Sequence, residues 1–267
     1  RLGDCAGIKW VNVHPHNRDL HGLPTVMAVY VLNDAATAFP LAVMDGTRLT
    51  SLRTGAAGAV ASKYLAQRAP KTIGFIGCGA QAYTLHAAHR VVFDGFESLA
   101  YDRNIDAAKR FAAEVGGRVV SLDQAAGSDI VCTATPSRTP FVHAHWIQPG
   151  AHVNAMGADA PGKRELSTET LKRAKVYIDD VHQATASGEI NVPFAGGDFS
   201  LEDIAGTLGE VVAGVLPRPS LATTTVFDST GLAIQDVSLA RAIYDAARSQ
   251  SIGQEIDLIG LDARERA

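Results

Sequence analysis

The 267-residue chain has 46% hydrophobic and 19% charged residues, a composition typical of a globular protein with one large domain or two modest ones. Its net charge of −4 offers no basic surplus for a phosphate backbone, so we expect no nucleic-acid partner. No apolar run reaches the roughly 18 residues that a membrane span needs, and the three cysteines form no CxxC pair. We therefore expect no membrane segment and a reducing, cytoplasmic setting.

The first part of the chain predicts a small antiparallel sheet followed by a helix. Residues 7–13, 24–32 and 40–45 are rich in Val, Ile and aromatic residues and are separated by turn-forming sequence, as in a strand meander. Residues 50–68 then predict an Ala-rich helix, which Thr50 or Ser51 could cap.

From residue 72 the pattern changes to short apolar runs that alternate with helical segments. Helices are predicted at 80–93 and 105–115. Strands are predicted at 72–76, 98–102, 118–122, 129–134, 152–157 and 175–180. Near-continuous apolar strands in a β–α alternation favour a parallel sheet that is covered on both faces. The sequence therefore predicts an α/β fold with a Rossmann-type, doubly wound parallel sheet.

The last part of the chain predicts helices at 200–216 and 233–249, with a short strand at 223–228 between them. We expect two domains. A Rossmann domain would span 53–195, and a discontinuous α+β domain with a mainly antiparallel sheet would combine 1–52 with 196–267.

A glycine-rich loop, residues 77–82, follows the strand 72–76 and precedes a helix. Gly77 would allow the tight turn, and Gly79 would let the backbone approach a pyrophosphate without a Cβ in the way. The pyrophosphate would bind the N–H groups at the helix N-terminus, with contacts from Gly77, Gly79, Ala80 and Gln81. An ordinary tight turn is the alternative.

Asp102 ends the second strand of this region and predicts the choice of cofactor. A carboxylate there would accept hydrogen bonds from the adenosine ribose and repel a 2′-phosphate, which favours NAD over NADP. Arg103 could instead bind that phosphate, and a solvated Asp–Arg pair at a turn is a further alternative. We expect NAD, with Asp102, Arg103 and Asn104 at its adenosine end.

Longer motifs run through nearly the whole chain: GIKWVNVHPHN (7–17), GLPTVMAVYVLND (22–34), FPLAVMDGTRLTSLRTGAAGAVASKYLA (39–66), GFIGCGAQA (74–82), NAMGADAPGKREL (154–166), DD–HQA–GEIN (179–191) and FDSTGLAIQDV (227–237). In this order they resemble the ornithine cyclodeaminase/mu-crystallin family, and within it most closely the archaeal-type alanine dehydrogenase branch. The resemblance implies a homodimer. It also implies a further segment before the GIKW strand, which completes the dimerisation domain and supplies an arginine for the substrate carboxylate; we expect this chain to lack that segment.

Two catalytic residues are implied by the resemblance. Lys9 matches the family lysine that contacts the substrate and donates and accepts protons, although alternation along its strand alone would make it solvent-facing. Oxidation of an amino acid to an imine, followed by hydrolysis, needs a group that moves protons near neutral pH. Asp159 matches a candidate acid or base that faces the substrate amine; a turn-forming Asp before Pro161 is the alternative.

The resemblance also implies further cofactor contacts. Arg53 would bind the pyrophosphate, unless it is an ordinary surface arginine of the helix. Lys163 would contact the cofactor, and Ser229 the nicotinamide end, where a helix cap is the alternative. The nicotinamide riboside would pass the ends of two strands, at Thr133, Ala134, Thr135, Met156, Gly157 and Ala158.

A metal site is not expected. The histidines that come closest to a cluster, His14, His16, His21, His143 and His145, have no Cys or carboxylate at a ligand spacing.

The activity implied by the resemblance is the reversible, NAD-dependent oxidation of a small amino acid, L-alanine, to its 2-oxo acid and ammonium. Ornithine cyclodeamination and the reduction of cyclic ketimines are enzymatic alternatives. A mu-crystallin-like protein that binds nucleotide without turnover is a non-enzymatic one.

Overall fold

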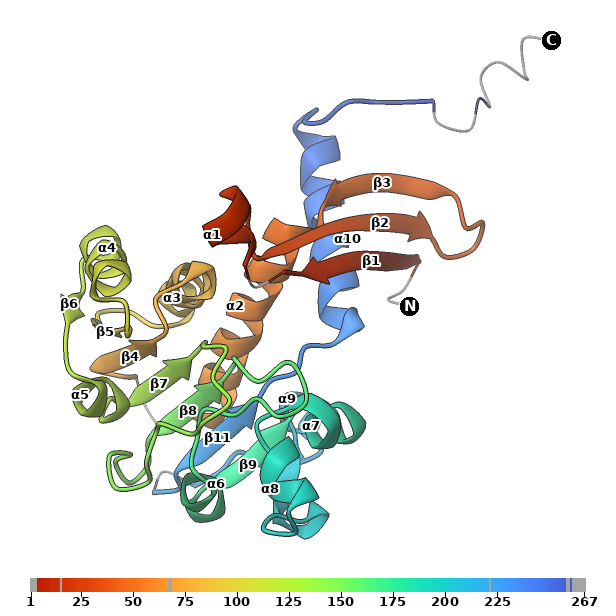
Figure 1. The fold of residues 1–267 in the computed structure, drawn as a ribbon. Coiled ribbons are helices and arrows are strands. Elements are labelled where there is room, and N and C mark those ends of the chain that lie inside the picture. The colour runs from red at the N-terminus through yellow and green to blue at the C-terminus, as the bar shows by residue number, and fades with distance from the viewer. Residues whose placement is uncertain (1–3, 15, 67–68, 221, 258–259, 261–267) are drawn as a thin grey trace. The chain divides into compact units, whose positions relative to one another are not determined.

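The computed structural model describes residues 4–14, 16–66, 69–220, 222–257 and 260. The chain divides into two compact units, one of residues 1–49 with 236–267 and one of residues 50–235. Each unit has its own sheet, and Figure 1 labels the elements of both.

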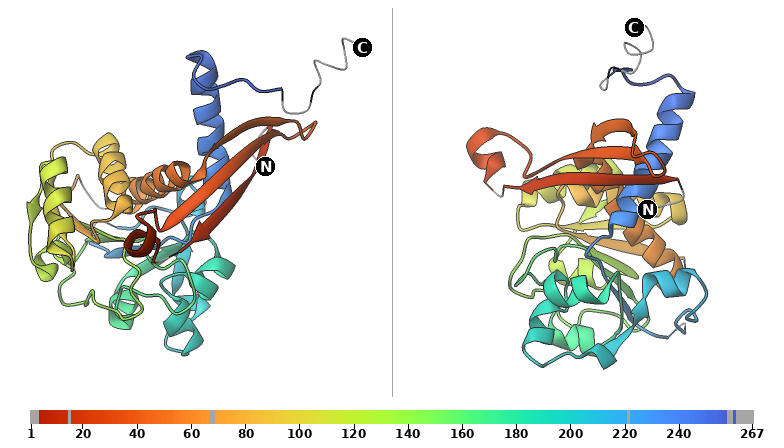
Figure 2. Two further views of the ribbon diagram at one scale, coloured as in Figure 1. Left: turned by 45° about the horizontal axis from the view of Figure 1, so that its top comes forward. Right: turned by 90° about the vertical axis from the view of Figure 1, so that its right-hand side faces the viewer.

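The first unit contains a three-stranded antiparallel sheet in the order β1 (Cys5–Val13), β2 (Val26–Asp34), β3 (Pro40–Asp45). A short helix, α1 (Asn17–His21), lies between β1 and β2. The predicted meander is confirmed. One face of the sheet packs on the part of α10 (Ala233–Ser249) that belongs to this unit, and Figure 2 shows these elements from two sides. The shared core contains Cys5, Tyr30, Leu32, Leu49, Val237 and Ala240.

Helix α2 (Gly46–Leu65) begins earlier than the sequence predicts. The Asp45 carboxylate accepts hydrogen bonds from the backbone N–H groups of Thr47 at 2.8 Å and Arg48 at 3.2 Å. Asp45 therefore satisfies the first helical N–H groups, and the predicted caps, Thr50 and Ser51, lie inside the helix.

The second unit contains an eight-stranded parallel sheet in the order β10-β9-β11-β8-β7-β4-β5-β6. Its strands are β4 (Thr72–Ile76), β5 (Glu97–Tyr101), β6 (Arg118–Val119), β7 (Ile130–Thr133), β8 (His152–Ala155), β9 (Lys175–Ile178), β10 (Ile204–Thr207) and β11 (Thr225–Asp228). The chain runs outward from β4 to β5 and β6, and then returns to the other side of β4 with β7 and β8. This reversal makes the fold doubly wound and confirms the predicted class.

Helices cover both faces of this sheet (Figure 1). Residues 50–65 of α2 pack on one face together with α3 (Ala80–Val92), α4 (Ile105–Val115) and α9 (Leu208–Val212). The opposite face packs on α5 (Leu122–Ala126), α6 (Thr168–Arg173) and α7 (Val181–Ser187). A further short helix, α8 (Asn191–Ala195), follows α7. Burial on both faces explains why the strand sequences are almost continuously apolar.

The predicted helix 200–216 is wrong. A 3-10 turn, η1 (Leu201–Asp203), leads into β10, which pairs with β9, and α9 begins only after Thr207. The Glu210 carboxylate accepts the Thr207 N–H at 2.8 Å, and the Thr207 hydroxyl accepts the Glu210 N–H at 3.2 Å. This reciprocal capping box starts a new helix and separates it from the strand.

The predicted domain boundary at residue 196 also needs correction. β10 and β11 lie in the large parallel sheet, and the second unit extends to Gln235. The physical reason is strand pairing: β11 inserts between β8 and β9, far from both along the chain. Residues 196–235 therefore share the Rossmann core.

Candidate functional site

The predicted cofactor residues of the second unit follow strands whose carboxyl ends meet at one edge. The register pairs Ile76 with Thr133, Thr133 with Ala155, Ala155 with Asp228, and Asp228 with Ile178. β4 and β7 run parallel, but the order in which the strands are added to the sheet reverses between them. Open α/β sheets bind ligands at such a switch point. The edge is therefore the place where a dinucleotide would lie.

The glycine loop begins with a backbone turn that requires glycine. Gly77 has φ +93°, and a Cβ there would collide with the carbonyl oxygen of Ala134 and the side chain of Thr135. Its N–H donates to the Tyr101 carbonyl at 2.9 Å. Gly77 therefore turns the chain tightly between two neighbouring strand ends.

Gly79 lies at the N-terminus of α3 and, unlike Gly77, is next to open space. No described atom lies within 4 Å of a Cβ placed on it, and its φ of −83° is ordinary. Among the residues that the structure describes, no side chain caps α3, and the first turn of α3 carries no acidic residue. The open space beside uncapped N–H groups fits the phosphate group of a dinucleotide.

Asp102 joins the loop to the end of β5. One carboxylate oxygen accepts the N–H of Cys78 and the other accepts the N–H of Asn104, both at 2.8 Å. A carboxylate oxygen can accept more than one hydrogen bond, so both remain able to bind hydroxyl groups. The Asn104 side chain caps α4, and Arg103 is exposed. Burial raises the pKa of the Cys78 thiol to about 12, so Cys78 fills space and is not a thiolate nucleophile.

Thr133, Thr135 and Gly157 are tied together by a carboxylate that the sequence analysis missed. Glu165 is fully buried. It accepts hydrogen bonds from the Thr133 hydroxyl at 2.6 Å, from the N–H and hydroxyl of Thr135 at 2.7 Å each, and from the Gly157 N–H at 3.0 Å. Both threonine hydroxyl protons are therefore committed to Glu165, and these side chains can offer a ligand only acceptor lone pairs.

Two more buried carboxylates continue this arrangement. Glu189 accepts the N–H of Glu165 at 2.8 Å and that of Leu166 at 2.5 Å. Asp228 accepts the N–H of Glu189 at 2.8 Å and that of Ile190 at 3.2 Å. Burial raises the pKa of Glu165. Burial and the nearby charge of Glu165 together raise the pKa of Glu189 well above its usual range. Burial also raises the pKa of Asp228, to about 7. Asp228 therefore fixes the backbone at Glu189, and Glu189 fixes the backbone at Glu165.

Asp179 is a hydrogen-bond acceptor for Ser229, the residue that the sequence predicts at the nicotinamide end. It accepts hydrogen bonds from the Ser229 hydroxyl at 3.1 Å, the Gly231 N–H at 2.8 Å and the Gln235 amide at 3.3 Å. Gln235 in turn accepts from the Arg53 guanidinium at 3.3 Å. Burial raises the pKa of Asp179, although the Gly231 N–H, Ser229 and Arg53 oppose that shift. The structure thus brings Arg53 and Ser229 together.

Asp159 and Lys163 form an ion pair within the loop after β8. The Asp159 side chain is exposed, whereas that of Lys163 is half-buried. Asn191 pins this loop, because its side chain accepts the Gly162 N–H at 2.9 Å and donates to the Lys163 carbonyl at 2.8 Å. The two residues that the sequence analysis assigned to separate roles therefore contact each other.

Lys9 belongs to the first unit and lies on the sheet face that α10 covers. Its ammonium contacts both carboxylate oxygens of Asp236, at 2.9 and 3.0 Å, and its side chain is 16% exposed. The neighbouring Ile8 and Trp10 point to the other face and are 67% and 74% exposed. The prediction from strand alternation that Lys9 faces solvent is wrong. Its side chain lies on the face that packs against α10, and the apolar side chains of Ile8 and Trp10 lie on the exposed face.

The part of the chain that the structure describes contains no group of three or more His, Cys, Asp or Glu side chains that could hold a metal ion. No helix of this part is long and apolar enough to cross a membrane.

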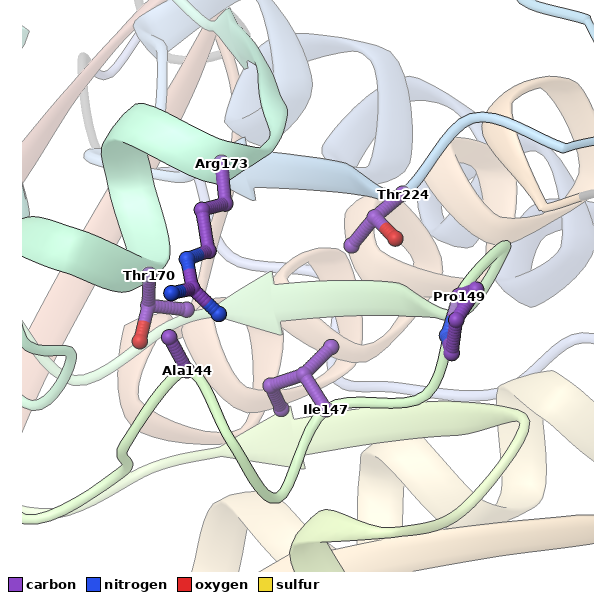
Figure 3. A pocket seen from close by; sticks show the side chains of 6 residues that line it. All are labelled: Ala144, Ile147, Pro149, Thr170, Arg173 and Thr224. Atoms are coloured by element: carbon purple, nitrogen blue, oxygen red, sulfur yellow. The ribbon is translucent and has the colours of Figure 1, made fainter.

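A small cavity of about 190 Å³ lies at the opposite edge of the large sheet (Figure 3). Pro149 and Thr224 precede β8 and β11, and Arg173 ends α6. Ala144, Ile147 and Thr170 complete its lining. None of these residues is predicted to bind cofactor or substrate.

The sequence carried a signal for the missed carboxylates. Asp179 directly follows the apolar strand β9, and Asp228 is the last residue of the apolar strand β11; both positions lie at the carboxyl edge of the sheet. Glu165, Glu189 and Asp236 lie in the motifs KREL, GEIN and AIQDV. Their partners are backbone groups or side chains remote in sequence, so their roles depend on the fold.

Comparison with known proteins agrees with this architecture. The model of the ornithine cyclodeaminase/mu-crystallin family matches residues 2–251. Alanine dehydrogenase of Archaeoglobus fulgidus is 51% identical over 257 residues, which are 94% of this chain and 80% of that protein.

Two solved structures are similar over nearly the whole chain. An archaeal alanine dehydrogenase dimer with bound NAD has a TM-score of 0.93 and 50% identity, covering 97% of this chain and 82% of that chain. The Delta(1)-pyrroline-2-carboxylate reductase of Thermococcus litoralis, in complex with NADH and L-proline, has a TM-score of 0.88 and 36% identity, covering 94% and 80%. The chain therefore belongs to the ornithine cyclodeaminase/mu-crystallin family.

Proposed function

We propose that the protein is an NAD-dependent oxidoreductase that converts L-alanine reversibly to pyruvate and ammonium. The observation that carries the proposal is the loop between β4 and α3, where Gly79 leaves open space at an uncapped helix N-terminus beside the Asp102 carboxylate. The 51% identity to an alanine dehydrogenase supports the choice of substrate.

The cofactor residues divide along the carboxyl edge. Gly79, Ala80 and Gln81 would hold the pyrophosphate through their N–H groups. Gly77, whose N–H donates to the Tyr101 carbonyl, would contribute the tight turn that brings the backbone close to it. Asp102 would accept the ribose hydroxyls, and its negative charge would disfavour a 2′-phosphate, with Arg103 and Asn104 beside it. The nicotinamide end would lie along Thr133, Ala134, Thr135, Met156, Gly157 and Ala158.

Three more residues complete the proposed cofactor contacts. Arg53 and Ser229 lie near Asp179 and would reach the pyrophosphate and the nicotinamide end, respectively. Lys163, which pairs with Asp159, would contact the cofactor from the loop after β8. The bound cofactor supplies the hydride acceptor, and the protein orients it.

Proton handling would fall to Lys9 and Asp159. The Lys9 ammonium donates hydrogen bonds to both carboxylate oxygens of Asp236, and we propose that it also donates to a substrate oxygen. Hydrolysis of the imine needs a base for water, and either Asp159 or Lys9, after it has given up its proton, could serve.

A second candidate activity is the reduction of cyclic ketimines. The similarity to a reductase in complex with NADH and L-proline supports it. Ornithine cyclodeamination would share the first oxidation step, but a side-chain amine would trap the imine and no net NADH would form. A nucleotide-binding protein without turnover is the non-enzymatic alternative.

We also propose that the protein is a homodimer. Ile8, Trp10, Val29 and Val43 lie on the outer face of the antiparallel sheet and are 67%, 74%, 49% and 64% exposed. A contiguous apolar face of this kind commonly marks a protein interface. The archaeal alanine dehydrogenase that the chain resembles is a dimer.

The substrate is tested by supplying NAD with L-alanine, L-ornithine or L-proline and measuring NADH absorbance and the product. We expect NADH and pyruvate with L-alanine. Proline formation from ornithine without net NADH would replace the proposal with ornithine cyclodeamination. NADH formation with L-proline but not with L-alanine would replace it with the ketimine reductase alternative. Nucleotide binding without turnover on any of these substrates would favour the non-enzymatic one.

The role of Lys9 is tested by Lys9→Ala. We expect NAD affinity to persist, because the proposed cofactor residues lie in the other unit, and turnover to fall by about two orders of magnitude or more. Unchanged turnover would remove Lys9 from the mechanism.

A further inference from the structure

The ion pair between Lys9 and Asp236 connects two elements that are remote in sequence. Lys9 lies in β1, opposite Tyr30 of β2, and Asp236 lies in the first turn of α10. Both oxygens of Asp236 contact the same ammonium, at 2.9 and 3.0 Å. The two side chains are only 16% and 8% exposed, so water screens this pair far less than it screens a surface salt bridge.

The surroundings hold the Asp236 carboxylate in place. Asp236 precedes Val237 and Ala240, which belong to the buried core between α10 and the sheet. A negative charge in the first turn of a helix is also favoured by the helix dipole. The carboxylate is therefore a fixed group, whereas lysine has a flexible four-carbon side chain.

Tyr30 limits the space around the pair. A Cβ at Gly7 would collide with the Tyr30 hydroxyl, so Gly7 makes room for this ring on the covered face of the sheet. Burial, together with the nearby carboxylate of Asp236, raises the pKa of Tyr30, so Tyr30 stays neutral and brings no second negative charge to the ammonium. Asp236 is thus the carboxylate that directs Lys9.

We infer that Asp236 is the positioning residue of Lys9: it holds the ammonium on the covered face of β1 with two of its three N–H donors and leaves the third for a substrate oxygen. The inference rests on the proposed catalytic role of Lys9. It explains why a buried ion pair occurs at this position, because such pairs contribute little net stability by themselves.

The experiment compares Asp236→Asn with Asp245→Asn in the full chain. Asp245 lies on the same helix, but it pairs with Arg241 and is exposed, so its substitution removes a carboxylate without touching Lys9. We expect Asp236→Asn to lower kcat for alanine by about 10- to 100-fold, because a misplaced catalytic group costs that much, and to leave KM and NAD affinity nearly unchanged. Asp236→Glu, which keeps the charge, should restore part of the lost kcat, and Asp245→Asn should stay within about twofold of wild type.

A double-mutant cycle separates positioning from a merely structural contribution. If Asp236 acts through Lys9, the Lys9→Ala, Asp236→Asn double variant has the same residual kcat as Lys9→Ala alone. Additive losses, or wild-type kcat in Asp236→Asn, would overturn the inference.

A readout that does not depend on turnover keeps this inference distinct from the proposed function. Brief reductive methylation followed by peptide mass spectrometry reports how reactive the Lys9 amine is. We expect Lys9 to be labelled several-fold faster in Asp236→Asn than in wild type or Asp245→Asn, and Asp236→Glu to restore most of the protection. Equal labelling in all four proteins would overturn the inference even if alanine is the substrate. If Lys9 is labelled faster in Asp236→Asn but the protein does not turn over alanine, the result would contradict only alanine as the substrate.

Discussion

The Asp102 carboxylate accepts a hydrogen bond from the backbone N–H of Cys78 at 2.8 Å. The residue proposed to select the cofactor therefore also supports the glycine loop. Loss of its charge would act on both the ribose and the loop.

Asp102→Asn is expected to weaken NAD binding by about tenfold and to reduce the preference for NAD over NADP, because it removes a charged acceptor that would also repel a 2′-phosphate. Isothermal titration with both nucleotides measures the effect. Asp106→Asn, which removes an exposed carboxylate from the first turn of α4, serves as the control. An unchanged ratio of the two affinities would argue against Asp102 as the selecting group.

Gly79→Val and Gly77→Val should fail for different reasons. A Cβ at Gly79 meets no described atom, so this variant should keep nearly the wild-type Tm and lose most of its NAD affinity. A side chain at Gly77 would meet Ala134 and Thr135 at a positive φ, which should lower the free energy of unfolding by about 2 kcal/mol or more. Thermal melting and nucleotide titration distinguish the two. Full NAD affinity in folded Gly79→Val would contradict the proposed phosphate site.

Glu165→Ala is expected to reduce the free energy of unfolding by about 3 kcal/mol, because it leaves four donors, of the buried Thr133 and the half-buried Thr135 and Gly157, without their acceptor. Glu169→Gln removes a carboxylate from an exposed pair with Arg173 and should cost no more than about 0.5 kcal/mol. Urea unfolding measures both. Equal losses would show that Glu165 has no special structural role.

His89 should make stability depend on pH. Its Nδ1 lies 2.7 Å from the Leu85 carbonyl, which can only accept, so Nε2 accepts from the Ser62 hydroxyl at 2.8 Å and the ring is neutral. Burial lowers the pKa of His89 to about 4. His89 takes up a proton below about pH 6.5 in the unfolded chain but only near pH 4 in the folded chain. The free energy of unfolding is therefore highest above pH 6.5 with respect to His89, and it decreases as the pH falls from 6.5 toward 4.

The contribution is isolated by comparing wild type with His89→Gln. The difference in their free energies of unfolding should be constant above pH 7 and should change by about 1 kcal/mol per pH unit between 6.5 and 4, to the disadvantage of wild type. A difference that is independent of pH would mean that His89 titrates alike in the folded and unfolded chains.

Trp10→Glu tests the proposed dimer. A charge on the apolar outer face should raise the dimer dissociation constant by at least about tenfold, because it would be buried in the interface without a partner. Val91→Glu alters a residue of α3 that is 87% exposed and should leave the assembly unchanged. Sedimentation equilibrium compares them. A wild-type monomer, or equal dissociation constants, would contradict the proposed interface.

Local sequence determined the elements that surround the cofactor loop. The strand 72–76, the tight turn at Gly77 and the helix 105–115 occur where the sequence predicts them. Apolar runs, the backbone freedom of glycine and capping residues all act within a few positions of the chain. The parallel arrangement and the doubly wound fold follow from the same alternation.

Only the tertiary structure decided which distant groups meet. β11 joins the parallel sheet between β8 and β9, Glu165 collects donors from two other strand ends, and Lys9 pairs with a carboxylate 227 residues away. No local pattern specifies such pairs, because each depends on strand order, register and the packing of a helix on a sheet. Burial in the tertiary structure also shifts the pKa values of the carboxylates and of His89, because a carboxylate or imidazole removed from water loses the solvation that its ionised form requires.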